Sequence, residues 1–388
     1  MNILNCVKTK SFRLYNSIKY YIQLDYNEND SLESIFEKYR GALELMKGKN
    51  IQILFEKIFC PLSSYHVVIA RRESLFVEMN MDIPPLSFIE GKSVDNNIAG
   101  VLFCGVICLS DDVSVSYYKK YGKTLGSVYE SPFFRYLYLY GLQAKKGSDG
   151  KINYPQFKEL FQEIGNIIVE NGFLPKDILR TWIYLDDINN NYGSFNQARR
   201  EYFEENNIQY SAHDNELPAS TCIGGSSFDS SILINLVCVD KKTASPKIKR
   251  IYNQFQNEAE GEAYLFRPTF SRALLVEEAE FSELQVSGTA SINEKGETVF
   301  LQQPYEQIRK TILNVADLLK QAKHDFSDFC EATCFFKKPE YYNDYLEVLK
   351  ELNITGLSGT CVIGDVCRDD LLFEFDGVSI KKRENHRP

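Results

Sequence analysis

Apolar side chains recur with the same spacing in two long stretches of the chain. Helices are predicted over 155–172 and 304–322, because each range carries one apolar stripe at helical spacing. Matching stripe residues lie 151 positions apart: Phe157, Phe161, Ile164 and Ile168 in the first helix, and Ile308, Ile312, Val315 and Leu319 in the second. This repeat indicates two copies of one folding unit rather than a solenoid.

The elements around these helices repeat as well. After each helix come an acidic turn with a strand, a second helix and two closing strands. The matching ranges are 176–185 and 327–336, 194–205 and 340–352, 220–225 and 359–364, and 232–236 and 371–375. Each unit reads β-β-α-β-α-β-β, which predicts an α+β fold with two helices on one face of a mixed sheet. The other sheet face must also be buried, most simply against another unit.

The first part of the chain is less regular. Strands are predicted at 17–24 and 66–70, and a helix at 31–47 with Ser31 as its N-cap. The apolar run 99–109 is too short to span a bilayer and predicts a buried strand. We therefore expect an N-terminal α/β segment of unclear role at 1–96, a first unit at 97–242 and a second unit at 243–388.

Composition narrows the classes of protein that need to be considered. The net charge of −9 and the absence of a basic block argue against nucleic-acid binding. The ten cysteines show no framework spacing, and the N-terminus has no sustained apolar region, so we expect reduced thiols and a cytoplasmic location. The four histidines are scattered, and we expect no metal site and no cofactor.

The stretch 359–377 carries the clearest candidate chemistry. It reads as a strand, a polar turn at 368–370 and a second strand in which Glu374 stands among Leu and Phe residues. A carboxylate in such surroundings loses water and tends to stay protonated, which suits a general acid. Cys367 precedes the turn, so both side chains could line one pocket. The alternative is a solvated acid on an open sheet face and a small buried cysteine.

Short motifs in the second unit resemble the YjgF/RidA family, whose sheets pack together in trimers. Phe270-Ser-Arg-Ala273 resembles the family's Tyr-Ser-Gln-Ala, and Val286-Ser-Gly288 resembles its strand ending in Ser-Gly. The family's deaminases hold a substrate carboxylate with an Arg before a late Ser-Cys. Ser220 and Gly359 stand at the matching positions, so we do not expect imine deamination.

A closer resemblance is to the chorismatase family, two-module relatives of RidA that act on chorismate. Four stretches carry it: Pro218–Gly225, Phe195–Arg199 with the strand at 180–182, Ser287–Ile292, and Asp365–Glu374. The last resembles the family's Asp-x-Cys-Arg-x-Glu-Leu-Leu-x-Glu. Cys222 departs from the family's Gly, and Asn293-Glu294 stand where it has Gly-His. The resemblance implies tandem RidA-like, or chorismate-mutase-like, modules.

The resemblance also implies a reaction. It assigns to Glu374 the role of the general acid that would protonate the enol ether of chorismate and so release pyruvate. Cys367 together with Gly288 marks the subtype that makes 3-hydroxybenzoate. In the first unit Asn235 aligns with Glu374 and is not acidic, so we expect one complete site per chain.

The substrate has two carboxylates, and bidentate Arg is their preferred partner. Arg272, Arg267 and Arg199 are the candidates. We expect no partner that is a nucleic acid or a membrane. The protein is expected to be a monomer with internal pseudo-symmetry or a homo-oligomer such as a trimer. A small-carboxylate binding protein without turnover, a partner-binding protein and an imine deaminase-like member remain alternatives.

Overall fold

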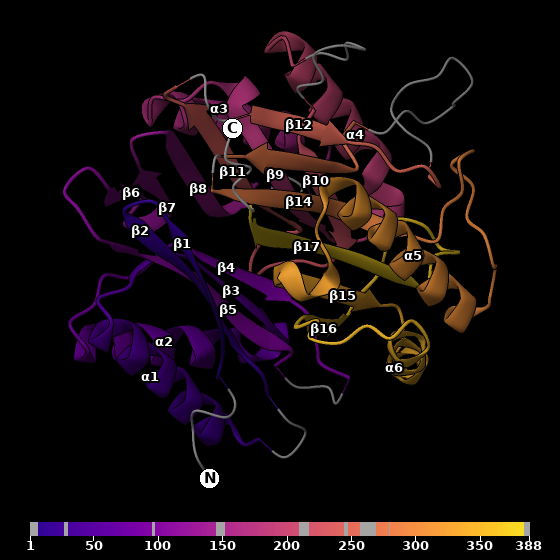
Figure 1. Ribbon diagram of the computed structural model, residues 1–388, viewed down its shortest axis with the longest axis horizontal. Coiled ribbons are helices and arrows are strands. Elements are labelled where there is room, and N and C mark those ends of the chain that lie inside the picture. Colours follow the sequence, from indigo (N-terminus) through magenta and orange to yellow (C-terminus); the bar gives the residue numbers. More distant parts are fainter. Residues whose placement is uncertain are drawn as a thin grey trace.

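The protein is described from a computed structural model, which places residues 7–26, 30–94, 98–144, 152–208, 217–243, 247–256, 269–278 and 280–383. Its strands form three separate mixed sheets. Figure 1 shows the three sheets around the middle of the molecule, with the helices on the outside. No helix in the described ranges is long and apolar enough to cross a membrane.

The first sheet has the strand order β1-β2-β5-β3-β4. Its strands are β1 (Val7–Leu14), β2 (Ser17–Leu24), β3 (Gln52–Cys60), β4 (Leu86–Glu90) and β5 (Gly100–Cys108), with helices α1 (Leu32–Gly48) and α2 (Tyr65–Glu78). The Ser31 side chain accepts a hydrogen bond from the backbone N–H of Ser34 and caps α1, as predicted.

The second sheet has the order β6-β7-β8-β11-β9-β10. Its elements are β6 (Ser114–Lys120), β7 (Lys123–Glu130), β8 (Phe134–Gln143), α3 (Tyr154–Glu170), β9 (Ile178–Leu185), α4 (Ile188–Glu205), β10 (Ala219–Gly224) and β11 (Ile232–Lys241). The third has the order β12-β13-β14-β17-β15-β16. Its elements are β12 (Lys247–Ile251), β13 (Ala273–Glu277), β14 (Phe281–Ala290), α5 (Pro304–Ala322), β15 (Phe329–Phe336), α6 (Tyr341–Glu351), β16 (Thr360–Ile363) and β17 (Phe373–Lys382).

If the outer strands β6 and β12 are left out, the remaining strands follow the same order in all three sheets. In each sheet neighbouring strands are antiparallel except for the last pair, which is parallel: β3–β4, β9–β10 and β15–β16. The predicted α+β class and the tandem modules are confirmed. The N-terminal part, whose role was unclear from the sequence, is a third module of the same topology. The expected division at residue 97 does not follow the sheets, because β5 pairs with β2 and β3 of the first sheet.

Two predicted elements were wrong in type or length. The range 66–70 is not a strand but lies in α2, because Val68, Arg72 and Phe76 recur at helical spacing and are buried together. The helix predicted from residue 194 begins earlier, at Ile188, which is itself buried. All nine cysteines in the described ranges are free thiols.

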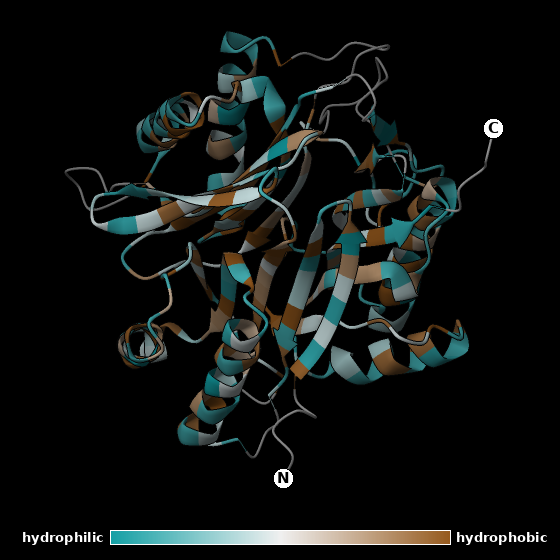
Figure 2. Cartoon of the chain, turned by 60° about the vertical axis from the view of Figure 1, so that its left-hand side comes forward, coloured by the Kyte–Doolittle hydropathy of each residue, from teal (hydrophilic) through white to brown (hydrophobic). Residues whose placement is uncertain are grey.

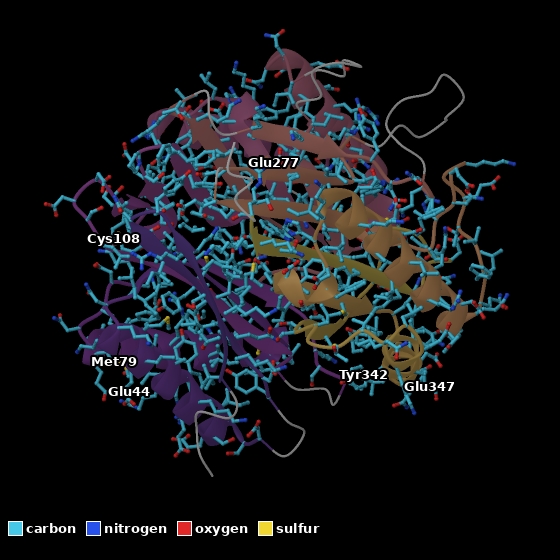
Figure 3. The ribbon with its side chains drawn as sticks, viewed as in Figure 1. Glu44, Met79, Cys108, Glu277, Tyr342 and Glu347 are labelled. Atoms are coloured by element: carbon cyan, nitrogen blue, oxygen red, sulfur yellow. The ribbon has the colours of Figure 1, made fainter. Side chains whose placement is uncertain are left out.

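The sheets share one central core and each has a second core under its own helices. At the centre Phe59 of β3 lies 6.1 Å from Tyr184 of β9 and 6.3 Å from Phe335 of β15, measured between ring centroids. Brown segments in Figure 2 follow the strands toward this centre. The labelled Glu44 of α1 and Glu347 of α6 lie at the periphery in Figure 3. Each sheet thus buries its second face against the other modules, as predicted.

Three buried ion pairs cross between modules. Lys19 of β2 lies 3.0 Å from Glu283 of β14, Lys57 of β3 pairs with Glu331 of β15, and Arg180 of β9 lies 3.4 Å from Asp376 of β17. The third module supplies the carboxylate in all three pairs, and the first two modules supply the cations. Removing one partner from such a pair strands a buried charge, so the pairs favour one arrangement of the three modules.

Candidate active site

Glu374 lies near the start of β17, at the junction of the second and third modules, with 4% of its surface exposed. Burial raises the pKa of its carboxyl to about 8, and the charge of Asp376 adds to the rise. Arg272, Arg180 and Arg368 act in the opposite direction. The carboxyl is therefore neutral near pH 7, which is the state that a general acid requires.

A bulge in the neighbouring strand makes room for this carboxyl. In β14 the pairing with β17 skips from Val286 to Thr289, so Ser287 and Gly288 bulge out of the ladder. A Cβ on Gly288 would lie 2.0 Å from Oε1 of Glu374 and 3.2 Å from Cγ2 of Thr221. The Glu374 carboxyl thus occupies the space that a side chain at position 288 would fill.

Arg180 and Asp376 form an ion pair beside the acid, and both are fully buried. Nη2 of Arg180 also donates a hydrogen bond to Oγ1 of Thr221 at 2.6 Å. Glu374 and Asp376 stand two residues apart, on one face of β17. The sequence motifs do not identify Arg180 or Asp376 as site residues. The available signal was one charged residue in the middle of the apolar strand 178–185.

Cys367 is partly buried and packs against the central core and the core of the second module. Burial raises the pKa of its thiol to about 12, and the charge of Glu374 contributes to the rise. The structure therefore brings Cys367 and Glu374 together, on either side of the turn. At this pKa the Cys367 thiol is neutral and is a weak donor rather than a nucleophile.

The three predicted arginines have different outcomes. Arg199 is buried, and its guanidinium donates to Oδ1 of Asn196 at 2.6 Å and to Oγ of Ser220 at 3.3 Å. Arg272 is also buried, and its charge reaches Glu374 and Cys367. Arg267 lies outside the described residues. The described part of the chain thus places two of the three cations at this junction, and their roles stay predictions.

The same junction recurs between the first and second modules, with other residues. The bulge of β8 holds Gly141, and the residue of β11 opposite that bulge is Asn235. Asn235 accepts a hydrogen bond from the Gly141 N–H at 2.9 Å and donates one to Oγ of Ser87 at 2.8 Å. This register matches Asn235 with Asp376, and it matches Leu233 with Glu374. The sequence alignment of Asn235 with Glu374 was therefore wrong by two residues, although the matching position still lacks an acid.

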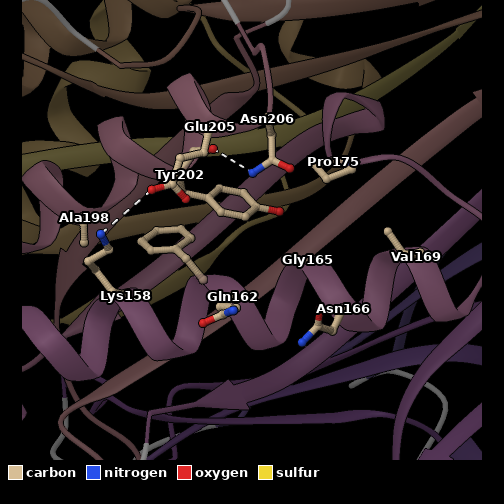
Figure 4. Close-up of a pocket in the computed structure, with 11 residues that line it drawn as sticks. Lys158, Gln162, Gly165, Asn166, Val169, Pro175, Ala198, Tyr202, Glu205 and Asn206 are labelled. Carbon is tan, nitrogen blue, oxygen red and sulfur yellow. Dashed lines mark hydrogen bonds and ion pairs between the residues drawn. The ribbon is translucent and has the colours of Figure 1, made fainter.

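A cavity of about 430 Å³ lies elsewhere, between α3 and α4 (Figure 4). Lys158, Gln162, Asn166, Tyr202 and Glu205 are among the residues that line it. Lys158 pairs there with Glu201, and Glu201 has a pKa lowered to about 2 by hydrogen bonds from Tyr154 and Lys158. The one acidic residue among the described residues of its lining, Glu205, is exposed. We place the active site at Glu374 because the chemistry of the buried acid, rather than open volume, defines it.

Fold and site together define an α+β protein of three modules with one topology, in which a buried acid of raised pKa lies at the junction of the second and third modules. No family model and no curated protein matches the chain. A crystal structure of chorismatase is similar, with 16% sequence identity and a TM-score of 0.63, over 93% of this chain and 98% of that chain. The chain therefore has the chorismatase fold, as the sequence motifs predicted.

Single-module structures match a smaller part. A putative endoribonuclease L-PSP from Entamoeba histolytica is 17% identical, covers 34% of this chain and 98% of its own, and has a TM-score of 0.28. The YjgF gene product of E. coli is 20% identical, with the same coverages and a TM-score of 0.26.

Proposed function

We propose that the protein is a chorismate-processing enzyme that releases pyruvate, with Glu374 as its general acid. The observation that carries this proposal is a buried carboxyl whose pKa is raised to about 8, held in the space left by Gly288. The chorismatase fold and the motif Asp365–Glu374 support the choice of substrate. We expect no metal or cofactor to be needed.

The proposed step is a proton transfer to carbon. Glu374 donates its proton to the methylene carbon of the enol ether, a C–H bond forms, and the positive charge spreads over the ether carbon and oxygen. Water then adds to the ether carbon and loses a proton, and the resulting hemiketal collapses to pyruvate and a ring that keeps the former ether oxygen as a hydroxyl. This ring is the dihydroxy-cyclohexadiene carboxylate, and loss of its other hydroxyl with a ring proton, as water, gives 3-hydroxybenzoate. Chorismate has the same atoms as 3-hydroxybenzoate plus pyruvate, so that product consumes no water overall. The dihydroxy-cyclohexadiene product consumes one water.

The two substrate carboxylates require cations. We propose Arg272 and Arg199, with Arg267 as the third candidate. A guanidinium can bind a carboxylate in a bidentate way and remains charged when it is buried. Arg272 is the candidate most directly tied to the acid, because its charge lowers the pKa of Glu374. When a substrate carboxylate binds Arg272, its negative charge would offset the pKa-lowering charge of Arg272 and so keep Glu374 protonated.

The rate is expected to fall as the pH rises through about 8. Only protonated Glu374 can donate, and its pKa is raised to about 8 by burial and by Asp376. The active fraction is therefore full below that pH and declines tenfold per pH unit above it. The measurement is kcat/KM for chorismate as a function of pH. An upper limb that begins near pH 5, as for an ordinary glutamate, would contradict the assignment.

Cys367→Ala is expected to leave pyruvate release intact and to change the ring product. We propose that the neutral thiol contacts the ring and guides the loss of its hydroxyl, so the mutant should make more of the dihydroxy-cyclohexadiene carboxylate and less 3-hydroxybenzoate. The shift should be larger when Gly288→Ala is added. Chromatography of the ring products measures the ratio. An unchanged ratio with a stability loss of about 1 kcal/mol would leave Cys367 as packing only.

The direct test is to incubate the protein with chorismate and to quantify pyruvate and the ring product. We expect equal amounts of the two. Chorismate binding by calorimetry without either product would show a binding protein and would overturn the proposal. Turnover of 2-iminobutyrate at a comparable rate would instead place the protein with the deaminases, despite Ser220 and Gly359.

A further inference from the structure

Two buried charges of opposite sign lie beside the candidate acid, and the proposed mechanism assigns neither of them a role. Asp376 is on the same face of β17, two residues from Glu374. Arg180 enters from β9 of the second module and reaches both Asp376, at 3.4 Å, and Thr221, at 2.6 Å. Thr221 in turn lies against the space of Gly288 that holds the Glu374 carboxyl.

We propose that Asp376 and Arg180 are positioning residues that set the protonation state of Glu374, by placing one buried negative and one buried positive charge beside it. The inference deepens the proposed function and rests on it. Asp376 opposes a second negative charge on its own strand face and so holds the proton on Glu374. Arg180 moderates this effect, because it partly neutralises Asp376 and itself attracts a charged Glu374.

The geometry explains why the carboxylate has the larger influence. Asp376 has 0% of its surface exposed, so water does not screen its charge, and its Oδ1 has no hydrogen-bond partner within the described residues. Its ion pair with Arg180 is single and 3.4 Å long, rather than bidentate. Arg180 is equally buried, and its Nε and Nη1 also lack a partner within the described residues, so the two charges oppose each other at Glu374. Asp376 shares a strand face with Glu374, and its effect on the pKa of Glu374 is the larger of the two.

The junction of the first two modules lacks this arrangement. There Asn235 takes the place of Asp376 and Leu233 the place of Glu374. Asn235 is neutral, and its oxygen and its nitrogen each make a hydrogen bond, to Gly141 and to Ser87. At that junction, therefore, neither the position of the acid nor the position of Asp376 carries a charge. The charged and titratable groups that face Glu374, from all packed elements, are Asp376, Arg180, Arg272, Arg368, Cys367 and Cys222.

If the proposal holds, substitutions of Asp376 and of Arg180 should shift the pKa of Glu374 in opposite directions. Asp376→Asn should lower the pKa of Glu374 by at least about one unit, because the remaining Arg180 charge favours ionisation. Arg180→Met should raise the pKa by a similar amount, because Asp376 is then unopposed. The double mutant should titrate below the wild type but above Asp376→Asn. A merely structural role for the pair would lower stability in both single mutants without opposite shifts.

The measurement is the pH-dependent infrared band of the protonated carboxyl, assigned by its absence in Glu374→Gln. It needs no substrate, so a protein that fails to turn over chorismate can still be tested, and failure of the proposed function is distinguishable from failure of this inference. Glu283→Gln is the control, since Glu283 is as buried as Asp376 and paired with Lys19, and its loss should leave the Glu374 band unchanged.

The double mutant keeps the test decisive if a single mutant does not fold, because it leaves neither charge unpaired. A double mutant that titrates below the wild type supports the inference. Shifts of the same sign in both single mutants, or a double mutant that titrates as the wild type does, would overturn it. For active variants, the upper limb of kcat/KM against pH should move in the same order.

Discussion

Glu374→Gln is expected to reduce pyruvate release from chorismate by at least about a hundredfold, with folding and chorismate binding retained. Glutamine keeps the shape of the protonated carboxyl and its capacity to donate a hydrogen bond, but it cannot transfer a proton to carbon. Because wild-type Glu374 is itself neutral near pH 7, the substitution removes no charge from the buried site. The loss should therefore appear in kcat, with KM little changed.

Two comparisons distinguish loss of the catalytic proton from loss of stability in the Glu374→Gln experiment. The melting temperature of Glu374→Gln should stay close to that of the wild type, since no buried charge is created or stranded. Leu233→Gln, at the matching position of the second module, is the matched control: it buries an unpaired amide and should lower stability while leaving the pH dependence of turnover unchanged. A Glu374→Gln protein with a near-normal rate would remove Glu374 from the mechanism.

Gly288→Ala is expected to lower the rate of pyruvate release by at least about tenfold without unfolding the protein. The added Cβ would lie 2.0 Å from Oε1 of Glu374, at the end of a flexible side chain, so the carboxyl must move. A displacement of about an ångström at a reacting group is sufficient for losses of this size. Kinetics at saturating chorismate, together with a thermal melt, measure both parts of the expectation.

Gly141→Ala is the informative partner of this variant, because Gly141 occupies the bulge of the second module. Its φ is +75°, and a Cβ there would lie 2.4 Å from the carbonyl oxygen of Leu86. Backbone cannot give way as a carboxyl side chain can, and the positive φ adds about 1–3 kcal/mol of strain. We expect Gly141→Ala to destabilise the protein. If Gly288→Ala were the variant that unfolds and Gly141→Ala the one that loses activity, the assignment of the two junctions would be wrong.

Much of the fold could be predicted because its second and third modules repeat visibly. The stripe of Ile308, Ile312 and Val315 in α5, matched in α3, reports local helix periodicity that one sequence contains. The first module was not recognised as a third copy. Its helix α2 contains the β-branched run at 66–70, and β5 lies beyond the position where a unit was expected to end. Strand order depends on contacts distant in sequence, which local periodicity does not reveal.

The sequence predicts those site residues that lie in short motifs, and it misses those that only the packing of different modules brings together. Glu374, Cys367 and Gly288 stand in short motifs, and the structure brings all three to one junction. Arg180 and Asp376 belong to different modules, and only the packing of β9 against β17 pairs them. The alignment of Asn235 failed because the connection before the last strand is two residues longer in the third module: the sheet pairings match Thr221 with Thr360 but Asn235 with Asp376. A sequence without its sheet does not show where such an insertion falls.

Pyruvate formation from chorismate by EDTA-treated, folded protein is the measurement that tests the central claim most directly. The wild type and Glu374→Gln should be compared at equal concentration near pH 7, with the uncatalysed rate measured alongside. We predict steady release of pyruvate by the wild type and a rate lower by at least about a hundredfold for Glu374→Gln. Pyruvate release by the wild type at the uncatalysed rate, or equal rates for the two proteins, would contradict the account.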